Sequence, residues 1–301
     1  MNATPVLDVG GSHVSAALVD TASWRPLPRT RRRAPLDSDG TAEEIIASIA
    51  ACAQEVGDLG GATLAVAMPG PFDYEGGIGR FEGVAKFDAL NGVDVGAGLL
   101  AALPAPPAKI VFLNDAVAFA LGEWVAGGLR GCARSVAITL GTGVGSAFLD
   151  SGSAILSGPL VPPSGSVHLL SIDGMPLEDV VSTRAIVAAY RGRVGDAAGV
   201  RQIAQRAEAG DHEASRVLGV ACAALGVAIA PWLARFGAEA LVVGGGIAKS
   251  WRLIEPPLRE GIESVSAGVA GLRIVRSDDP EASTEVGAAW HAVRSSPSLR
   301  S

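Results

Sequence analysis

The stretch VFLNDAVAFALGE, residues 111–123, indicates the class of fold to which this chain belongs. Its first apolar residues predict the end of a buried strand, Asn114-Asp115 follows, and the alanine-rich remainder predicts a helix. A strand that turns directly into a helix places two polar side chains at its carboxyl end, where open α/β sheets bind their ligands. We expect Asp115 to carry the chemistry. The alternative is that Asn114 or Asp115 only caps the following helix.

Composition and charge narrow the class of protein. The chain has 301 residues, enough for two domains and a large core, and its 39 glycines suit many strand-loop-helix junctions. A net charge of −7 gives no broad basic surface, so we expect no nucleic-acid partner. We expect the one basic run, residues 29–33 (RTRRR), to lie in a solvated loop.

Cysteine usage and hydropathy indicate a cytoplasmic protein. Cys52, Cys132 and Cys222 are scattered without a Cys-x-x-Cys pair, which argues against disulfides and a zinc site and suits a reducing cytosol. Asp8 interrupts the first apolar run, so we expect no signal peptide. The charge-free stretch 217–234 approaches the length of a membrane span. We expect a buried helix there and no membrane partner, with a span as the alternative.

Two strand-turn-strand units share one pattern, a turn of glycine and hydroxyl residues between two apolar runs. The first carries DVGGSH, residues 8–13, and the second is SVAITLGTGVGSAFL, residues 135–149. Backbone N–H groups in such turns form anion-binding nests. The candidate phosphate ligands are Gly10, Gly11, Ser12, Thr142 and Gly143. For either turn alone, an ordinary tight hairpin is the alternative. Asp8 would help to hold Mg²⁺, which takes one or two carboxylates together with waters and phosphate oxygens.

A third glycine-rich turn follows a predicted strand over residues 240–243. It fails the Walker A pattern, because Ala248 stands where a glycine is needed before Lys249. Bare backbone still suits the base and ribose of a nucleotide, so Gly245 and Gly246 are candidate ligands. A tight strand-to-helix turn is the alternative.

These motifs, in this order, resemble the ROK family of sugar kinases and repressors. The resemblance covers nearly the whole chain. The matching segments are Asp8 to His13 (first phosphate motif), Pro69-Gly70 (sugar loop), Asn114 to Glu123 (catalytic motif), Leu140 to Gly145 (second phosphate motif), Leu177-Glu178 with Ser182 to Ala185, and Gly244 to Ile247 (adenosine motif). The resemblance implies an α/β fold of the two-domain actin-like ATPase (ribonuclease H-like) type, with a cleft between domains. The expected small domain is 1–116 with 284–301, and the large domain is 117–283.

The resemblance also implies an activity, namely ATP-dependent phosphorylation of a hexose or amino hexose at the 6-hydroxyl. Asp115 would be the general base, and ATP and Mg²⁺ would be the cofactors. The implied sugar ligands are Gly70, Asn114, Asp115, His168 and Glu178. Family members also suggest a homodimer. A lone His is more often structural, and helix starts favour acids such as Glu178 in any case.

Two departures from the family pattern fall where the sugar is bound. Family kinases commonly carry Glu-x-Gly-His, but Gly165 stands three residues before His168. The family's zinc-binding cysteines usually follow that histidine, but residues 169–176 contain none, so we expect no zinc. We therefore expect glucose not to be the best acceptor, with Ser164, Ser166 or Asp173 replacing the lost carboxylate. An epimer and an amino sugar, such as glucosamine or kanosamine, remain open.

Other classes of function remain as alternatives. The repressors of the family carry an N-terminal helix-turn-helix domain, and the first phosphate turn at Asp8 leaves no room for one, so we expect no direct DNA binding. A sugar-responsive regulatory or binding protein without kinase activity is a second class. A kinase that uses polyphosphate as donor is a third.

Overall fold

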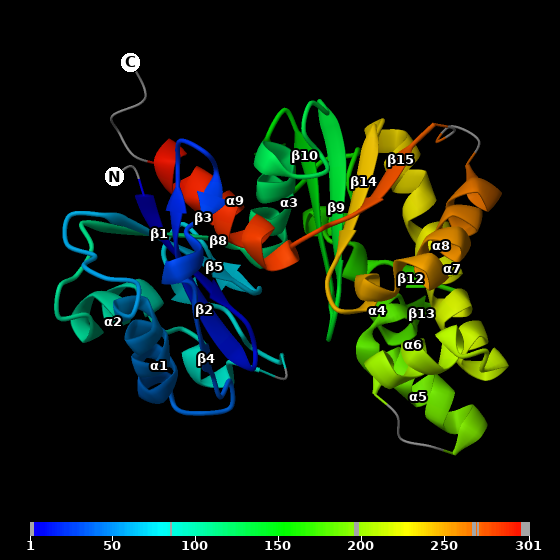
Figure 1. Ribbon diagram of the computed structural model, residues 1–301, viewed down its shortest axis with the longest axis horizontal. Coiled ribbons are helices and arrows are strands. Elements are labelled where there is room, and N and C mark those ends of the chain that lie inside the picture. The colour runs from blue at the N-terminus through cyan, green and yellow to red at the C-terminus, as the bar shows by residue number, and fades with distance from the viewer. Residues whose placement is uncertain (1–2, 85, 196–198, 267–268, 270, 296–301) are drawn as a thin grey trace. The chain divides into compact units, whose positions relative to one another are not determined.

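The computed structural model describes residues 3–84, 86–195, 199–266, 269 and 271–295. The chain forms two compact units, which are described separately (Figure 1). Unit 1 comprises Met1–Ala126 with Glu281–Ser301, and unit 2 comprises Gly127–Pro280.

Unit 1 is built on a sheet with the strand order β3-β2-β1-β5-β8, and β4 also pairs with β2. Its strands are β1 (Ala3–Val9), β2 (His13–Asp20), β3 (Arg25–Pro26), β4 (Arg32–Pro35), β5 (Thr63–Met68) and β8 (Lys109–Asn114). β1 is antiparallel to β2 and parallel to β5, which is parallel to β8. A short hairpin, β6 (Phe72–Asp73) and β7 (Ile78–Gly79), follows β5.

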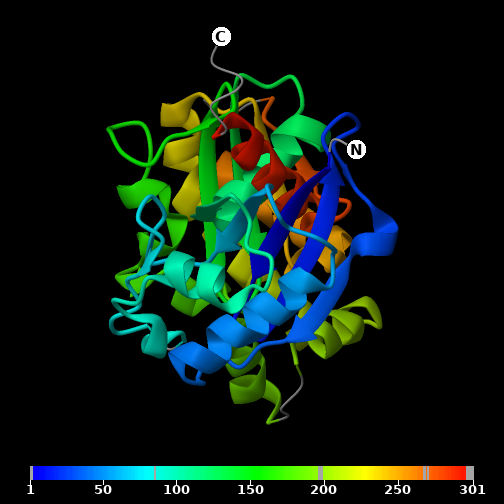
Figure 2. The ribbon, with the colours of Figure 1, turned by 90° about the vertical axis from the view of Figure 1, so that its left-hand side faces the viewer.

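In the described residues, α-helices cover both faces of the sheet of unit 1. They are α1 (Ala42–Gln54), α2 (Val95–Ala102), α3 (Asp115–Ala126) and α9 (Pro280–Arg294). α1 and α2 lie on one side of the sheet, facing the viewer in Figure 2, and α3 and α9 lie on the other. The buried faces of α1 and β5 therefore share one apolar core, which includes Ile45, Ile49, Leu64 and Val66.

Two glycines bring α3 and α9 into backbone contact. A Cβ on Gly122 would lie 1.7 Å from the carbonyl oxygen of Ser283, and one on Gly287 would lie 1.8 Å from that of Ala118. We expected the domain boundary at residue 116. In the structure all of α3 groups with unit 1, because this close packing ties it to α9.

Unit 2 repeats the sheet of unit 1, with the strand order β11-β10-β9-β14-β15. Its strands are β9 (Arg134–Leu140), β10 (Val144–Asp150), β11 (Ser153–Ala154), β14 (Ala240–Gly244) and β15 (Arg273–Arg276). β9 is antiparallel to β10 and parallel to β14, which is parallel to β15. The two predicted hairpins thus occupy equivalent places in two sheets of the same topology.

The helices of unit 2 pack on one another as well as on the sheet (Figure 1). They are α4 (Glu178–Val181), α5 (Thr183–Val194), α6 (Val200–Glu208), α7 (His212–Phe236) and α8 (Trp251–Val265). Within the described ranges, α7 alone is long and apolar enough to cross a membrane by length and composition. It packs closely along α8, since a Cβ on Gly226 would lie 2.3 Å from the carbonyl oxygen of Leu258. Its apolar composition therefore fits the expected core helix of unit 2.

The basic run over residues 29–33 is not the solvated loop that we expected. It forms a 3-10 turn, η1 (Pro28–Thr30), and the strand β4. Arg31 Nε lies 3.0 Å from Glu285 Oε1, and Arg33 Nη1 lies 2.8 Å from Glu281 Oε1. The two acids stand four residues apart on α9, so the run pairs a sheet edge with one face of that helix.

Candidate functional site

The junction between β8 and α3 carries Asn114 and Asp115 with no intervening loop. Asn114 Oδ1 accepts hydrogen bonds from the backbone N–H groups of Ala116 (3.0 Å) and Val117 (3.2 Å). Asp115 Oδ1 accepts one from Ala116 N at 2.8 Å. Asn114 therefore caps α3, and its role as a sugar ligand stays a prediction. Because Asn114 satisfies the first turn of α3, Asp115 is not needed as the main cap.

Tyr74 holds the other end of the Asn114 side chain. Its hydroxyl accepts a hydrogen bond from Asn114 Nδ2 at 3.0 Å and donates one to the carbonyl oxygen of Met68 at 3.2 Å. Burial raises the pKa of Tyr74, so the hydroxyl stays protonated. A Cβ on Gly70 would lie 3.2 Å from the Tyr74 hydroxyl, so Gly70 leaves this pair uncovered. Sequence analysis missed Tyr74, whose only signal is its place in the loop after Gly70.

Asp8 and Asp115 lie at one edge of the sheet of unit 1. Asp8 pairs with Ala67 of β5, which pairs with Leu113 of β8, so three parallel strands end together. Burial raises the pKa of Asp8 to about 7, and the charges of Asp115 and Glu285 add to this shift. Burial also raises the pKa of Asp115. Carboxylates shifted in this way are typical of sites that bind a cation or move a proton.

The chemistry of Asp8 fits the expected magnesium ligand. The repulsion between the Asp8 and Asp115 carboxylates would be relieved by a divalent cation. In the described part of the chain, no three His, Cys, Asp or Glu side chains gather to hold a metal on their own. Mg²⁺ suits such a site, because it takes few carboxylates and completes its shell with waters and phosphate oxygens.

The first phosphate turn joins β1 to β2 in unit 1. Gly10 N donates a hydrogen bond to the carbonyl oxygen of His13 at 2.9 Å, which closes the turn. Ser12 is exposed at the tip, with its Oγ 3.2 Å from His13 Nδ1. The glycines and the hydroxyl that we expected to bind phosphate are thus together on one turn, next to Asp8.

The second phosphate turn joins β9 to β10 in unit 2, and Glu178 lies against it. Glu178 Oε1 accepts a hydrogen bond from Val144 N at 3.0 Å, and a Cβ on Gly143 would lie 2.5 Å from that oxygen. Thr142 is exposed at the tip of the turn. The structure therefore brings an expected sugar ligand onto an expected phosphate turn.

The third glycine turn, at Gly245, packs against the end of β9 in unit 2. Gly245 has φ +89°, and a Cβ there would lie 2.3 Å from the carbonyl oxygen of Leu140. Gly246 follows as an exposed residue before the turn η5 (Ile247–Ser250). Gly245 thus joins Thr142, Gly143 and Glu178 around one end of β9.

Gly165 has a structural reason to be glycine. It is buried with φ +65°, and a Cβ would lie 2.9 Å from the carbonyl oxygen of Ile155. Ser146 Oγ donates to the carbonyl oxygen of Gly165 and accepts from Val167 N, both at 2.9 Å. This backbone leaves no room for a glutamate at position 165. His168, three residues after Gly165, is exposed. Sequence analysis gave no signal for Ser146.

A small hairpin stands where the family's zinc loop would be. β12 (Ser171–Ile172) and β13 (Met175–Pro176) are joined by Asp173 and Gly174, both with positive φ as in a type I′ turn. The carbonyl oxygen of Leu170 accepts a hydrogen bond from Leu177 N at 2.8 Å and closes its base. The absence of zinc stays a prediction, which elemental analysis of the purified protein would check.

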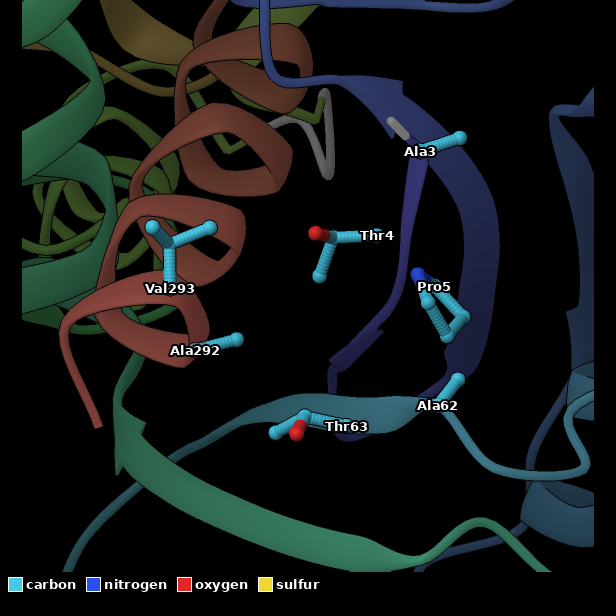
Figure 3. Close-up of a pocket in the computed structure, with 7 residues that line it drawn as sticks. All are labelled: Ala3, Thr4, Pro5, Ala62, Thr63, Ala292 and Val293. Carbon is cyan, nitrogen blue, oxygen red and sulfur yellow. The ribbon is translucent and has the colours of Figure 1, made fainter. Parts of the chain in front are cut away.

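One surface hollow lies away from these residues. It is lined by side chains where β1 and β5 begin and α9 ends, among them Thr4, Thr63 and Val293 (Figure 3). None of its lining residues is charged. Asp8 and Asp115 lie at the carboxyl ends of β1 and β8, which run parallel to β5, so the hollow at the amino ends is not part of the candidate site.

The chain is similar to known proteins along most of its length. The model of the ROK family matches residues 5–169 and 171–294. A glucokinase of Thermotoga maritima is 30% identical, over 85% of this chain and 86% of its own. An N-acetylmannosamine kinase of Escherichia coli is 28% identical, over 81% of this chain and 83% of its own. A ROK family glucokinase from Streptomyces griseus, crystallised with glucose and AMPPNP, superposes with a TM-score of 0.79 at 22% identity, covering 97% of this chain and 99% of that one. The chain belongs to the ROK family and has its actin-like ATPase fold.

Proposed function

We propose that this protein transfers the terminal phosphoryl group of ATP to the 6-hydroxyl of a hexose or amino hexose, with Asp115 as general base. That it is a sugar kinase follows from its kinase relatives. The observation that carries the finer proposal is the position of Asp115. It begins α3 at the carboxyl end of β8, beside an asparagine that already caps the helix.

Asp115 has the properties that a base needs. Burial raises its pKa, so its carboxylate has a higher proton affinity than an exposed aspartate. One carboxylate oxygen is oriented by Ala116 N. Asn114, fixed by Tyr74 and by the cap, has a second amide hydrogen to offer a sugar hydroxyl.

The phosphate groups would be bound largely by backbone. In unit 1, the turn of Gly10, Gly11 and Ser12 offers N–H groups and a hydroxyl. In unit 2, the expected nucleotide ligands are Thr142, Gly143, Gly245 and Gly246. Asp8 would hold Mg²⁺ through water, and the ion would neutralise phosphate charge. Phosphoryl transfer depends mainly on positioning and electrostatics, so no covalent intermediate with the protein is needed.

The acceptor is proposed to differ from glucose. The backbone at Gly165 excludes a side chain, so the carboxylate that family kinases commonly place there is missing. A site that lacks an acceptor for a ring hydroxyl favours a sugar that differs at that ring position. His168 and Glu178 are the proposed sugar ligands of unit 2.

An ADP-release assay over a panel of hexoses and hexosamines tests this function. ATP and polyphosphate are supplied as alternative donors, and NMR of the product identifies the phosphorylated hydroxyl. We expect turnover with ATP, and the highest kcat/KM for an epimer or amino sugar. A tenfold lead for glucose would contradict the argument from Gly165. Sugar binding without turnover would favour the regulatory alternative.

A further inference from the structure

Backbone hydrogen bonds hold both Lys86 and the residue after it in unit 1. Lys86 N donates a hydrogen bond to the carbonyl oxygen of Val84 at 2.8 Å, and Phe87 N donates one to that of Ser38 at 2.9 Å. Phe87 is fully buried with φ +61°, and its ring centroid lies 5.3 Å from that of Phe81. The neighbouring anchor therefore limits where the Lys86 side chain can go.

The stem of Lys86 crosses the first phosphate turn. A Cβ on Gly11 would lie 3.3 Å from Lys86 Cδ, so the absence of a side chain at Gly11 leaves space for the stem. The Lys86 side chain is partly buried. Its positive charge lowers the pKa of Asp115 against the effect of burial, so the ammonium acts on that carboxylate.

A structural ion pair does not account for this placement. Within the described residues, Lys86 forms no salt bridge with a carboxylate. The sequence contains three lysines, Lys86, Lys109 and Lys249, and its other strong cations are arginines. Lysine is a compact point charge on a flexible stem, which suits contact with a moving phosphoryl group.

We propose that Lys86 is a catalytic residue that contacts the phosphoryl group in transfer, a role that rests on the proposed kinase function. The sugar oxygen attacks the terminal phosphorus of ATP and forms the new P–O bond. The bond from that phosphorus to the oxygen shared with the β-phosphate breaks, and its electron pair leaves with ADP. The hydroxyl proton goes to Asp115. Lys86 keeps its proton and donates a hydrogen bond to a non-bridging oxygen of the transferred group.

Substitution of Lys86 separates rate from sugar binding. Lys86→Met keeps the stem and removes the charge, so we expect kcat to fall about 10²-fold, as for loss of one oxyanion donor. The KM for sugar should stay within about threefold, because the lost contact is to phosphate. Lys86→Arg keeps the charge and should retain more of the rate than Lys86→Met. Unfolding midpoints check that each variant is folded.

Lys109 provides the matched control. It stands at the amino end of β8, the strand that ends beside Asp115, and its Nζ donates to the carbonyl oxygen of Ser295 at 3.1 Å. Lys109→Met should leave kcat within about twofold, because it removes the same charge far from the phosphate turn.

Amine labelling gives a readout independent of turnover. Reductive methylation followed by mass spectrometry should show that magnesium AMPPNP slows modification of Lys86 and not of Lys109. Near-normal kcat in Lys86→Met, with Asp115→Asn inactive, would overturn this role and leave the kinase function intact. Labelling of Lys86 that AMPPNP does not change would overturn it as well. A wild-type protein that phosphorylates no sugar would overturn the kinase function and this role together.

Discussion

In unit 1, Asp8 precedes the pair Val9–Val14 that closes the β1–β2 ladder. In unit 2, Thr139 holds the same place before the pair Leu140–Val144. The two turns also differ in the side chain that faces a glycine of the turn. Gly11 of the first turn faces the stem of a lysine, whereas Gly143 of the second faces the carboxylate of Glu178.

The two turns share one backbone scaffold but differ in the side chains that surround them. In the second turn, Val144 N is already bonded to Glu178, so that donor is not available to a phosphate. Beside the first turn, a partly buried acid on β1 and a lysine stem accompany the glycines. Similar backbone geometry thus carries the proposed acid–base and phosphoryl site in unit 1 and a turn bonded to a carboxylate in unit 2.

The largest effect on activity is expected at Asp115, the proposed general base in unit 1. Asp115→Asn should lower kcat by about 10²–10⁴-fold, the usual contribution of a general base, and should leave sugar affinity nearly unchanged. Steady-state kinetics and calorimetric sugar binding measure the two quantities. Near-normal turnover would show that Asp115 is not the general base, and the proposed chemical difference between the two units would then be wrong.

Both units contain glycines where two helices cross, and substitution of these glycines by alanine should lower stability in both units. Gly122→Ala in α3 and Gly226→Ala in α7 each place a Cβ within 2.3 Å of a carbonyl oxygen. Each should reduce the free energy of unfolding by about 1–3 kcal/mol, as overpacking does. Denaturant unfolding measures the change.

Gly219 is the control for these variants. It also lies in α7, and a Cβ there would meet nothing within 4 Å. Gly219→Ala should raise the free energy of unfolding by up to about 1 kcal/mol, because alanine is the better helix former. A loss of stability at Gly219 equal to that at Gly226 would contradict the packing argument.

The glycines of the two turns should differ in their tolerance of alanine. At Gly143 the new Cβ would lie 2.5 Å from Glu178 Oε1 and must displace a bonded carboxylate. We expect Gly143→Ala to lower kcat/KM by about tenfold, equivalent to about 1.4 kcal/mol. At Gly11 the neighbour is a flexible lysine stem at 3.3 Å, so Gly11→Ala should cost less. The reverse order would show that the second turn is the less constrained.

The smallest effect concerns the pH dependence of stability. The pKa of Asp8 is raised to about 7 in the folded protein, so the folded state binds a proton more tightly than the unfolded state. The free energy of unfolding therefore falls as pH rises from about 4 to about 7.

Asp8→Asn removes this ionisation. Measured in chelator without magnesium, the variant should be more stable than wild type at pH 8, and the difference should shrink toward pH 5. Thr139→Val, at the equivalent place in unit 2, should change stability equally at all pH values. A pH-independent effect of Asp8→Asn would show that its carboxylate is well solvated.

Patterns within short segments predicted much of this protein. Alternating apolar runs around glycine predicted the β1–β2 and β9–β10 hairpins, and the run ending in Asn114-Asp115 predicted the β8–α3 junction. These signals succeed because strand and helix periods and glycine turns act over a few residues. The order of such motifs was enough to identify the family.

Only the tertiary structure decided which side chains meet. Tyr74 reaches Asn114 from 40 residues away, and Arg31 reaches Glu285 from 254 residues away. Glu178, whose sequence context only marks a helix start, lies on the turn at Gly143. No local pattern encodes such contacts, because they depend on the path of the whole chain through its sheets. The sequence by itself therefore determined the elements, the motifs and the family, whereas folding determined how the proposed catalytic carboxylate, the residues around it and the lysine are assembled.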